Sequence, residues 1–510
     1  MTSFPSRRKR KATNKINRFE SIGAVVKLTV AILAALWFNI CLYSIILFGE
    51  AFMEKERSSF TGRIGFVLAA AGSAVGLGNL WRFPYLAAKY GGGIFLLVYI
   101  ILAVTFGFAL MVTEIAIGRK TGLSCIGAYS KLDKRFGFLG WLSALVPVII
   151  TPYYCVIGGW VVKYFFEFVS GHGKDIAADS ASFFSSFIGM QGGIADNPTL
   201  WFLIFVLLTA AVVIFGVEKG IEKVSKIMMP VLVILCVVIA VFALTIDGAV
   251  AGLKYYLLPD FSKFSSATVL GALGQLFYSM SLSMGIMITY GSYMKKDNNI
   301  EKSVRQIEIF DTGVALLAGL IIIPSVVAFN GGTADGINAG PGLMFITLPQ
   351  VFNAMGSIGG IVGTLFFLLV FFAAITSSIS LMETVVSMVR DKLHLNRVLA
   401  TVIVTAGTVA IGLLSVFGYG PLANFKILGM QMLDFFDFIS NSVLMPIVAF
   451  ITCILIGHVI GTKVIADEVG LSGKFAGEKL HKVMVRWIAP ILLVVILVAQ
   501  VLSTFGIITI

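Results

Sequence analysis

Asp311 lies within a largely apolar stretch of the sequence, EIFDTGVALLAGL. A carboxylate near the centre of a membrane helix costs about 2.5–3.5 kcal/mol on insertion scales, so its presence there indicates a functional site. A bound cation is the partner that would offset this cost. The alternative is a residue at the inner end of its helix that reaches the aqueous interface.

A second group of polar side chains lies in the apolar stretch FFAAITSSISLMET, residues 371–384. Thr376, Ser377 and Ser378 carry hydroxyl oxygens, which can coordinate a hard cation such as Na⁺. Ser and Thr also bond back to the backbone of their own helix, so these residues have a purely structural explanation as well. This cluster and Asp311 are both candidates to complete a cation site.

A third apolar stretch, residues 62–86, is interrupted near its middle. The interruption consists of small and polar residues: Gly72, Gly76, Gly78, Asn79, Arg82 and Pro84. Asn79 and Arg82 are costly in lipid, and irregular backbone at this depth is tolerated only around a cavity or a site. The alternative, a GxxxG packing face from Gly72 to Gly76, does not account for these two residues.

Residues 266–292 are interrupted at a similar depth. The residues responsible are Tyr278, Ser279, Ser281, Ser283 and Gly285. Serines that bond back within a continuous helix are the alternative explanation. Unwound backbone would serve for binding, because free amides at a half-helix N-terminus attract a carboxylate and free carbonyls coordinate Na⁺.

The elements that must position these residues are membrane helices. Only 13% of the 510 residues are charged and 58% are hydrophobic, whereas soluble domains are about 25% charged. A helix that crosses the bilayer needs about 20 apolar residues. Twelve stretches meet this need: 22–48, 62–86, 91–117, 138–168, 199–216, 224–246, 266–292, 305–329, 356–390, 398–417, 433–460 and 484–509.

The distribution of Lys and Arg predicts the orientation of these segments. With the first stretch set aside and 62–86 entering from the cytoplasm, the inward loops hold 20 Lys and Arg residues and the outward loops five. The inward loops are 118–137, 217–226, 293–305, 390–397 and 461–486. This is the positive-inside asymmetry, so the net charge of +12 reflects topology and not a surface for nucleic acid.

The stretch 22–48 disagrees with this topology, because the basic cluster at 7–18 would then lie outside. It is a cleaved signal, a segment that dips in without crossing, or part of an upstream extension before a true start at Met53. The predicted division is therefore an extension at 1–52, a ten-helix core at 53–460, and a cytoplasmic loop with a final helix at 461–510.

The two interrupted stretches are the first and sixth of the eleven core segments. They occupy equivalent positions in two five-helix units. Paired interruptions of this kind predict a transporter built on an inverted repeat, with its binding site at the membrane midplane.

The stretch RIGFVLAAAGSAVGLGNLWRFPY, followed by GGGIFLLVY, resembles the neurotransmitter:sodium symporter family, and the resemblance extends over 57–509. It is nearest to bacterial eleven-helix members that import amino acids. The resemblance implies an all-α leucine-transporter fold, a 5+5 inverted repeat with broken first and sixth core helices and an eleventh core helix. This fold is itself the usual example of an inverted repeat, so its agreement with the paired interruptions is not independent support.

The resemblance implies two sodium sites. The first would use Ala74, Asn79, Ser279 and Asp311 together with the substrate carboxylate. The second would use carbonyls of Gly72, Val75 and Ala373 with the hydroxyls of Thr376 and Ser377. The family often has Thr where Ser279 stands, and the hydroxyl is kept.

The resemblance also implies a substrate site next to these ions. The substrate carboxylate would meet amides near Leu77 and Gly78 and the hydroxyl of Tyr154, beside Ala74 and Ser279. The substrate side chain would lie among Ile150, Tyr278, Ser281, Met284, Ser377 and Leu381. Without the resemblance, Ile150, Met284 and Leu381 would be interpreted as plain core packing.

Gates follow from the same resemblance. Arg82 and Asp437 would form the outer pair, with Tyr278 as an aromatic lid. Arg57 and Asp391 would form the inner pair, with Tyr293 beside them. The alternative for each charge is a solvated residue at the interface.

Gly220 and Pro230 flank nine residues at the inner end of the fifth core helix. In relatives this spacing lets the helix unwind and admits water to the second sodium ion, although a proline alone could merely kink the helix. One departure concerns Asp311, because animal members have Asn there and bind chloride nearby. A fixed carboxylate would supply that negative charge, so chloride independence is predicted.

The expected function is sodium-coupled import of a hydrophobic or aromatic amino acid by alternating access. The protein would lie in the plasma membrane (the bacterial inner membrane), with the core N-terminus in the cytoplasm and the C-terminus outside. The expected partners are the amino acid and lipid, not nucleic acid. The rivals are a channel or sensor, a transporter that uses Asp311 as a proton carrier, and a membrane enzyme. No nucleophile–base set or metal spacing supports an enzyme. The solute and the oligomeric state stay open.

Overall fold

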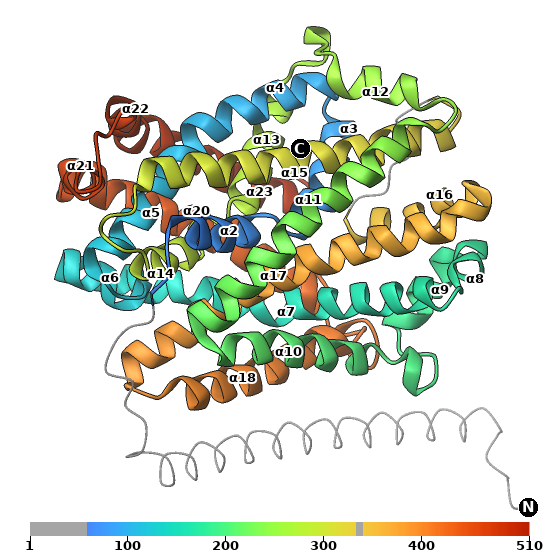
Figure 1. Cartoon of the computed structure of the whole chain (residues 1–510), viewed down its shortest axis with the longest axis horizontal. Helices are drawn as coiled ribbons and strands as arrows, with labels where there is room; N and C mark the ends of the chain where they lie inside the picture. Colours follow the sequence, from blue (N-terminus) through green and yellow to red (C-terminus); the bar gives the residue numbers. More distant parts are fainter. Residues whose placement is uncertain (1–58, 333–339, 509–510) are drawn as a thin grey trace, which may run out of the picture. The chain divides into compact units, whose positions relative to one another are not determined.

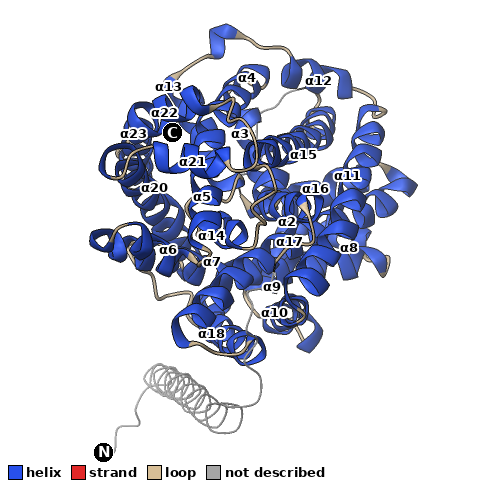
Figure 2. Ribbon diagram, turned by 60° about the vertical axis from the view of Figure 1, so that its left-hand side comes forward, coloured by secondary structure: helices blue, strands red, loops and turns tan. Residues whose placement is uncertain are grey.

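The computed structural model describes residues 59–332 and 340–508 (Figure 1), which belong to one compact unit, Lys55–Ile510. Helices joined by loops make up this part of the chain (Figure 2), so the all-α prediction is confirmed. The apolar stretch 22–48, the choice between interpretations of 1–52, and the inner-gate residue Arg57 lie outside the described residues.

Helices occupy the position of every predicted core span. In chain order they are α2 (Arg63–Ala74) with α3 (Phe83–Lys89), α4 (Gly93–Leu102) with α5 (Phe108–Thr121), α7 (Gly137–Val169), α10 (Pro198–Ile214), α11 (Lys223–Leu244), α13 (Ser266–Ser279) with α14 (Ile286–Ser292), α15 (Ile300–Phe329), α17 (Gly359–Leu393), α18 (Arg397–Gly418), α19 (Met432–Asp437) with α20 (Met445–Ile454), and α23 (Ala489–Thr504). The shorter helices between them are α6 (Cys125–Leu132), α8 (Gly173–Ala178), α9 (Ser180–Ile188), α12 (Ala249–Leu257), α16 (Leu348–Ala354), α21 (Lys463–Gly470) and α22 (Glu478–Val483).

Eight helices in the described part are long and apolar enough to cross a membrane, or nine if the bent pair Arg63–Ala74 and Gly78–Lys89 counts as one span. Two predicted spans fall short of this measure for physical reasons. Helix α10 has only 17 residues. Helices α13 and α14 are separate because the chain between them is not helical.

The first interruption lies between α2 and α3. Val75 has extended backbone, with φ −72° and ψ 101°, and the two halves of the segment are bent by 54°. The Asn79 side chain stabilises the break, because its Oδ1 accepts a hydrogen bond from the Gly76 amide at 3.0 Å. A π-type turn at Gly78–Arg82 then leads into α3.

The second interruption lies between α13 and α14 and is tighter. Ser281 and Ser283 have left-handed backbone, with φ of 52° and 62°, and Gly285 follows with φ of 72°. Residues other than glycine are strained in this backbone region, at a cost of about 1–2 kcal/mol each. An α-helix does not continue through such residues, so their backbone groups take other partners: the Ser283 amide donates to Glu114 Oε1 at 2.6 Å.

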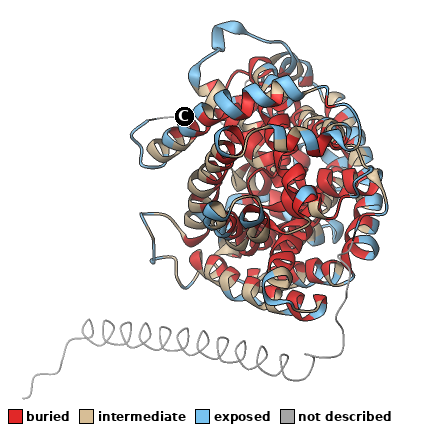
Figure 3. Ribbon diagram, turned by 90° about the vertical axis from the view of Figure 1, so that its left-hand side faces the viewer, coloured by how far each residue is buried: buried red, intermediate tan, exposed pale blue. Residues whose placement is uncertain are grey.

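The long helices α7 and α17 pack side by side next to the two breaks, and α15 packs against α2 (Figure 1). Buried residues gather on the central helices and exposed ones on those around them (Figure 3). The outer helices α11 and α23 expose large apolar side chains, among them Ile234, Val241, Ile491 and Val498. Such a surface is suited to lipid as its solvent.

Candidate functional site

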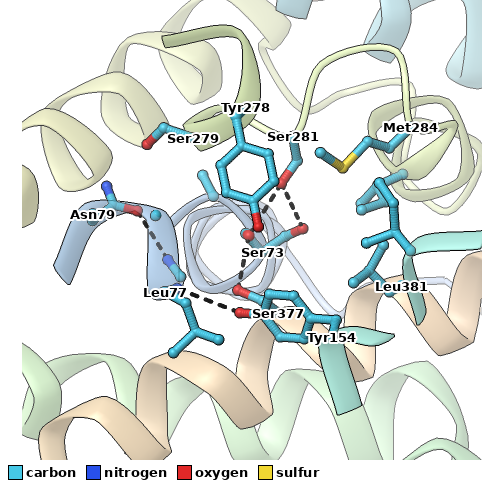
Figure 4. A pocket seen from close by; sticks show the side chains of 15 residues that line it. Ser73, Leu77, Asn79, Tyr154, Tyr278, Ser279, Ser281, Met284, Ser377 and Leu381 are labelled. Carbon is cyan, nitrogen blue, oxygen red and sulfur yellow. Dashed lines mark hydrogen bonds between the residues drawn. The ribbon is translucent and has the colours of Figure 1, made fainter. Parts of the chain in front are cut away.

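The two breaks, α7 and α17 line one cavity (Figure 4). Every residue predicted to bind the substrate lines it. The full lining is Ser73, Ala74, Gly76, Leu77, Gly78, Asn79, Ile150, Tyr154, Tyr278, Ser279, Ser281, Met284, Ile286, Ser377 and Leu381. The structure therefore brings the predicted substrate residues together, and their role in binding stays a prediction.

One side of this cavity presents backbone donors. The Leu77 amide donates to the Tyr154 hydroxyl at 3.4 Å, which is long for a hydrogen bond. Leu77 belongs to the break, so its amide has no partner within a continuous helix. A carboxylate placed beside the two groups, in the cavity, would accept a hydrogen bond from each, as anions do at helix N-termini.

The opposite part of the cavity is apolar. Ile150 comes from α7, Met284 from the second break and Leu381 from α17, and each is at most 4% exposed. Figure 4 shows Met284 and Leu381 together on one side of the Ser73–Ser281 pair. The cavity thus combines a polar end for a carboxylate with an apolar end for a side chain.

Asp311 is completely buried next to the first break. Its Oδ1 accepts hydrogen bonds from Asn79 Nδ2 and Ser279 Oγ, both at 2.8 Å, and its Oδ2 accepts one from Tyr99 at 3.3 Å. These donors are neutral, and no Lys, Arg or His in the described residues is ion-paired with Asp311. A buried carboxylate with neutral partners alone leaves one negative charge to be balanced.

The residues around Asp311 fit a sodium ion. The carboxylate and the Ser279 hydroxyl supply oxygen atoms, and Na⁺ would supply the missing positive charge. Asn79 presents its Nδ2 to the carboxylate and its Oδ1 to the Gly76 amide, so its side-chain amide would have to turn over to add a further oxygen. The structure brings the predicted residues Asn79, Ser279 and Asp311 into direct contact, while Ala74 lines the adjoining cavity. The interpretation of Asp311 as an interface residue does not suit its complete burial.

A second group of oxygens surrounds Ser377. The carbonyls of Gly72, Ser73 and Val75 lie 3.3, 3.1 and 3.2 Å from the Ser377 hydroxyl oxygen. One hydroxyl has one proton, so it satisfies only one of these acceptors well at a time. The surplus of acceptor oxygens suits a hard cation.

Thr376 lies next to this group, because a Cβ added to Gly72 would be 3.3 Å from the Thr376 Cβ. The Thr376 hydroxyl itself donates to the carbonyls of Phe372 at 2.8 Å and Ala373 at 3.3 Å in its own helix. The local back-bonding expected as the alternative is therefore present. Turning the hydroxyl towards α2 would add it to the oxygens around Ser377.

The predicted outer-gate residues are present but not paired. Arg82 lies 5.6 Å from the centre of the Tyr278 ring, at cation–π distance. Asp437 instead accepts hydrogen bonds from the Tyr153 hydroxyl at 3.1 Å and from Asn441 Nδ2 at 2.5 Å. Within the described ranges Arg82 and Asp437 form no ion pair, so this pairing stays a prediction.

At the other end of the helices, Asp391 Oδ2 accepts the Ser124 amide at 2.8 Å. Tyr293 donates to Glu383 Oε1 at 2.8 Å, and Glu383 forms a buried ion pair with Arg397. The arginine partner predicted for Asp391 lies outside the described residues. Gly220 lies in a π-type turn, Val217–Glu222, and Pro230 lies inside α11.

Sequence reasoning missed several residues of this site. Tyr99 looks like an ordinary core aromatic, and nothing in the sequence links it to Asp311. Gln275, whose Nε2 donates to the Gly78 carbonyl at 3.0 Å, could have been found as an amide inside a membrane stretch. Ser73 and Glu383 are missed because their partners are set by tertiary packing.

Three comparisons bear on this site. A family model described as Sodium:neurotransmitter symporter family matches residues 57–172 and 169–507. The sodium-dependent transporter YhdH of Bacillus subtilis, itself uncharacterised, is 34% identical over 463 residues, which are 87% of this chain and 97% of that protein. A sodium- and chloride-dependent GABA transporter of Drosophila melanogaster is 28% identical over 377 residues, 66% of this chain and 40% of that protein. The crystal structure of MhsT in complex with L-phenylalanine has a TM-score of 0.77 and 34% identity, covering 87% of this chain and 100% of that chain.

Proposed function

Because the chain belongs to the sodium:neurotransmitter symporter family and is a sodium-dependent transporter, we propose that it imports a hydrophobic or aromatic amino acid with two sodium ions. It has the leucine-transporter fold, and its family is one of sodium-coupled transporters, not enzymes. The observation that carries the proposal is the buried carboxylate of Asp311. It is bonded to Asn79 and Ser279, which line a cavity with one polar and one apolar end.

An amino acid suits this cavity at both ends. Its carboxylate would accept hydrogen bonds from the Leu77 amide and Tyr154, and would complete the oxygen shell of the first sodium ion. Its side chain would lie against Ile150, Met284 and Leu381. MhsT, a relative of the same fold, was crystallised with L-phenylalanine, which supports an apolar side chain of this size.

Two ions are proposed because two separate groups of oxygens surround the cavity. One is built on Asp311, and the other on the Ser377 hydroxyl and the carbonyls of α2. Ion and amino acid stabilise each other at the first group, which makes their binding a reciprocal coupling. Each sodium ion that moves inward releases about 2.3 kcal/mol of free energy per 100 mV of membrane potential, in addition to the free energy of its concentration gradient.

The proposed cycle is alternating access in the plasma membrane. The start of α2 faces the cytoplasm and the C-terminus faces outside, as the positions of Lys and Arg favour. Sodium holds the outer-open state, and binding of the amino acid lets Tyr278 and the Arg82–Asp437 pair close. Unwinding between Gly220 and Pro230 then admits water to the second ion. The predicted division at residues 52 and 460 is kept as part of this proposal.

The test is uptake into membrane vesicles that contain the full-length protein. We expect labelled phenylalanine, leucine, tyrosine or tryptophan to accumulate above the external concentration when an inward sodium gradient is imposed. A potassium gradient of the same size is the control. Equilibration without accumulation would support a channel or sensor, and accumulation driven by a proton gradient alone would support the rival use of Asp311.

Chloride independence is a separate prediction of this proposal. The Asp311 carboxylate already supplies a fixed negative charge beside the first sodium site, so a bound anion is not needed. Replacing all chloride by gluconate should change the initial uptake rate by less than about twofold. The loss of a required anion would be expected to reduce the rate about tenfold or more, which corresponds to ~1.4 kcal/mol. A large drop in uptake would contradict it. The Drosophila relative, which is named chloride-dependent, would serve as the positive control.

A further inference from the structure

Glu222 is a buried carboxylate that no predicted site includes. It ends the π-type turn Val217–Glu222 just before α11 and is 1% exposed. Its Oε2 accepts the Thr61 amide at 2.8 Å, and its Oε1 accepts the Thr61 hydroxyl. Lys226 pairs with Oε1 at 2.6 Å from the more exposed side. Both carboxylate oxygens of Glu222 thus accept hydrogen bonds from Thr61, just before α2, and one of them also pairs with a lysine.

The start of α2 is shaped around this carboxylate. A Cβ added to Gly65 would overlap the Glu222 side chain, whereas one added to Gly62 meets nothing within 4 Å. The Thr61 carbonyl accepts Lys295 Nζ at 3.4 Å, and the Phe60 amide donates to the Tyr293 carbonyl at 3.1 Å. Helices α2 and α11 pack against each other (Figure 1), so Glu222 fastens one to the other.

The segment that carries Glu222 is also fastened at its far end. Arg397, itself ion-paired with the buried Glu383, donates from Nε to the Val213 carbonyl at 2.8 Å. Between these two attachments the chain turns at Gly216, with φ of 87°, and forms the wide turn that contains Gly220. Wide π-type turns are easily rearranged and are frequent at functional sites. Any unwinding here must therefore move Glu222 relative to Thr61.

We propose that Glu222 is a positioning residue that holds the cytoplasmic end of α2 closed, and that unwinding at Gly220 releases this end and opens the inner exit. The inference rests on the proposed function for its meaning in transport. The Gly220–Pro230 spacing alone does not connect these two events. The Glu222 carboxylate joins the segment that unwinds to the start of α2, so unwinding at Gly220 and release of α2 occur together.

The experiment is hydrogen–deuterium exchange on the full-length protein in NaCl and in KCl. Glu222→Gln keeps the size of the side chain but removes its negative charge. Gly65→Ala places a methyl group where the Glu222 carboxylate lies and so displaces it. Both variants should raise the rate of amide hydrogen exchange in peptides covering 59–70 by about tenfold. This is the effect expected when roughly one charge-assisted hydrogen bond is lost. Both should also move the midpoint of the sodium titration to higher concentration, because an open inner exit opposes sodium binding.

Gly62→Ala serves as the matched control, because it adds the same methyl group three residues away in open space. Its exchange and its sodium titration should stay within about twofold of the parent. Exchange raised evenly over the whole chain would mean a merely structural role and would overturn the proposal.

The outcome also separates this inference from the proposed function. Unchanged exchange at 59–70 in both Glu222→Gln and Gly65→Ala overturns the role of Glu222 and leaves amino-acid import standing. Failure of the parent to accumulate any amino acid in vesicles overturns the proposed function. Raised exchange confined to 59–70, with Gly62→Ala unchanged, supports the inference whichever amino acid is carried.

Discussion

Asp311→Asn is expected to weaken sodium binding at the first site by about 100-fold or more. Removing one partner of a buried charge pair costs about 3–5 kcal/mol, and each 1.4 kcal/mol is a factor of ten. The asparagine oxygen can still accept from Asn79 and Ser279, so the variant removes the charge and keeps most of the hydrogen bonds. The measurement is a sodium titration of the melting temperature at constant ionic strength.

The matched control is Glu308→Gln, which neutralises another buried carboxyl one turn away on α15. Glu308 is ion-paired with Arg305 at 3.3 Å and has no hydrogen bond to the proposed sodium ligands, so its sodium titration should change much less than that of Asp311→Asn. In Asp311→Asn alone, chloride should recover part of the lost affinity relative to gluconate. An unchanged titration in Asp311→Asn would remove Asp311 from the sodium site.

Gly76→Ala is expected to reduce amino-acid affinity by about 5- to 150-fold, the range that corresponds to 1–3 kcal/mol of overpacking. A Cβ at this position would lie 2.8 Å from Ser377 Oγ and 3.1 Å from the Tyr154 hydroxyl oxygen. Ser377 has a short side chain and Tyr154 a packed ring, both buried on long helices, so neither can move away freely. The measurement is sodium-dependent stabilisation by phenylalanine or leucine.

Gly62→Ala is again the control, because it places a methyl group on the same segment without a neighbour within 4 Å. The melting temperature of Gly76→Ala without sodium and amino acid checks that the fold is intact. Parent-like affinity in Gly76→Ala would show that α2, α7 and α17 do not meet as closely as the structure has them.

The positions of the spans could be predicted closely from the sequence. The stretch 138–168 corresponds to α7, Gly137–Val169, and 356–390 corresponds to α17, Gly359–Leu393. Long apolar runs determine where a helix crosses, because every backbone group must be satisfied inside lipid. The breaks were also visible, since Asn79 is costly in lipid and the serines around Ser281 interrupt an otherwise apolar stretch.

The partners of the charged and polar groups could not be predicted in the same way. Glu383 with Arg397 is a contact between consecutive helices, whereas Asp437 with Tyr153 and Glu222 with Thr61 join segments far apart in sequence. Each depends on how helices pack, which hydropathy does not encode. The wide turns inside otherwise continuous spans, such as Ala103–Gly107, are equally invisible, because their residues are as apolar as the helix around them.

Ser377 contacts the carbonyls around the proposed second ion and also lines the cavity proposed for the amino acid. Ser279 likewise contacts Asp311 and lines that cavity. Replacing either serine to change substrate specificity would therefore weaken sodium coupling together with substrate binding. Redesign of specificity should keep both hydroxyls and change Ile150, Met284 and Leu381, whose side chains would contact only the substrate.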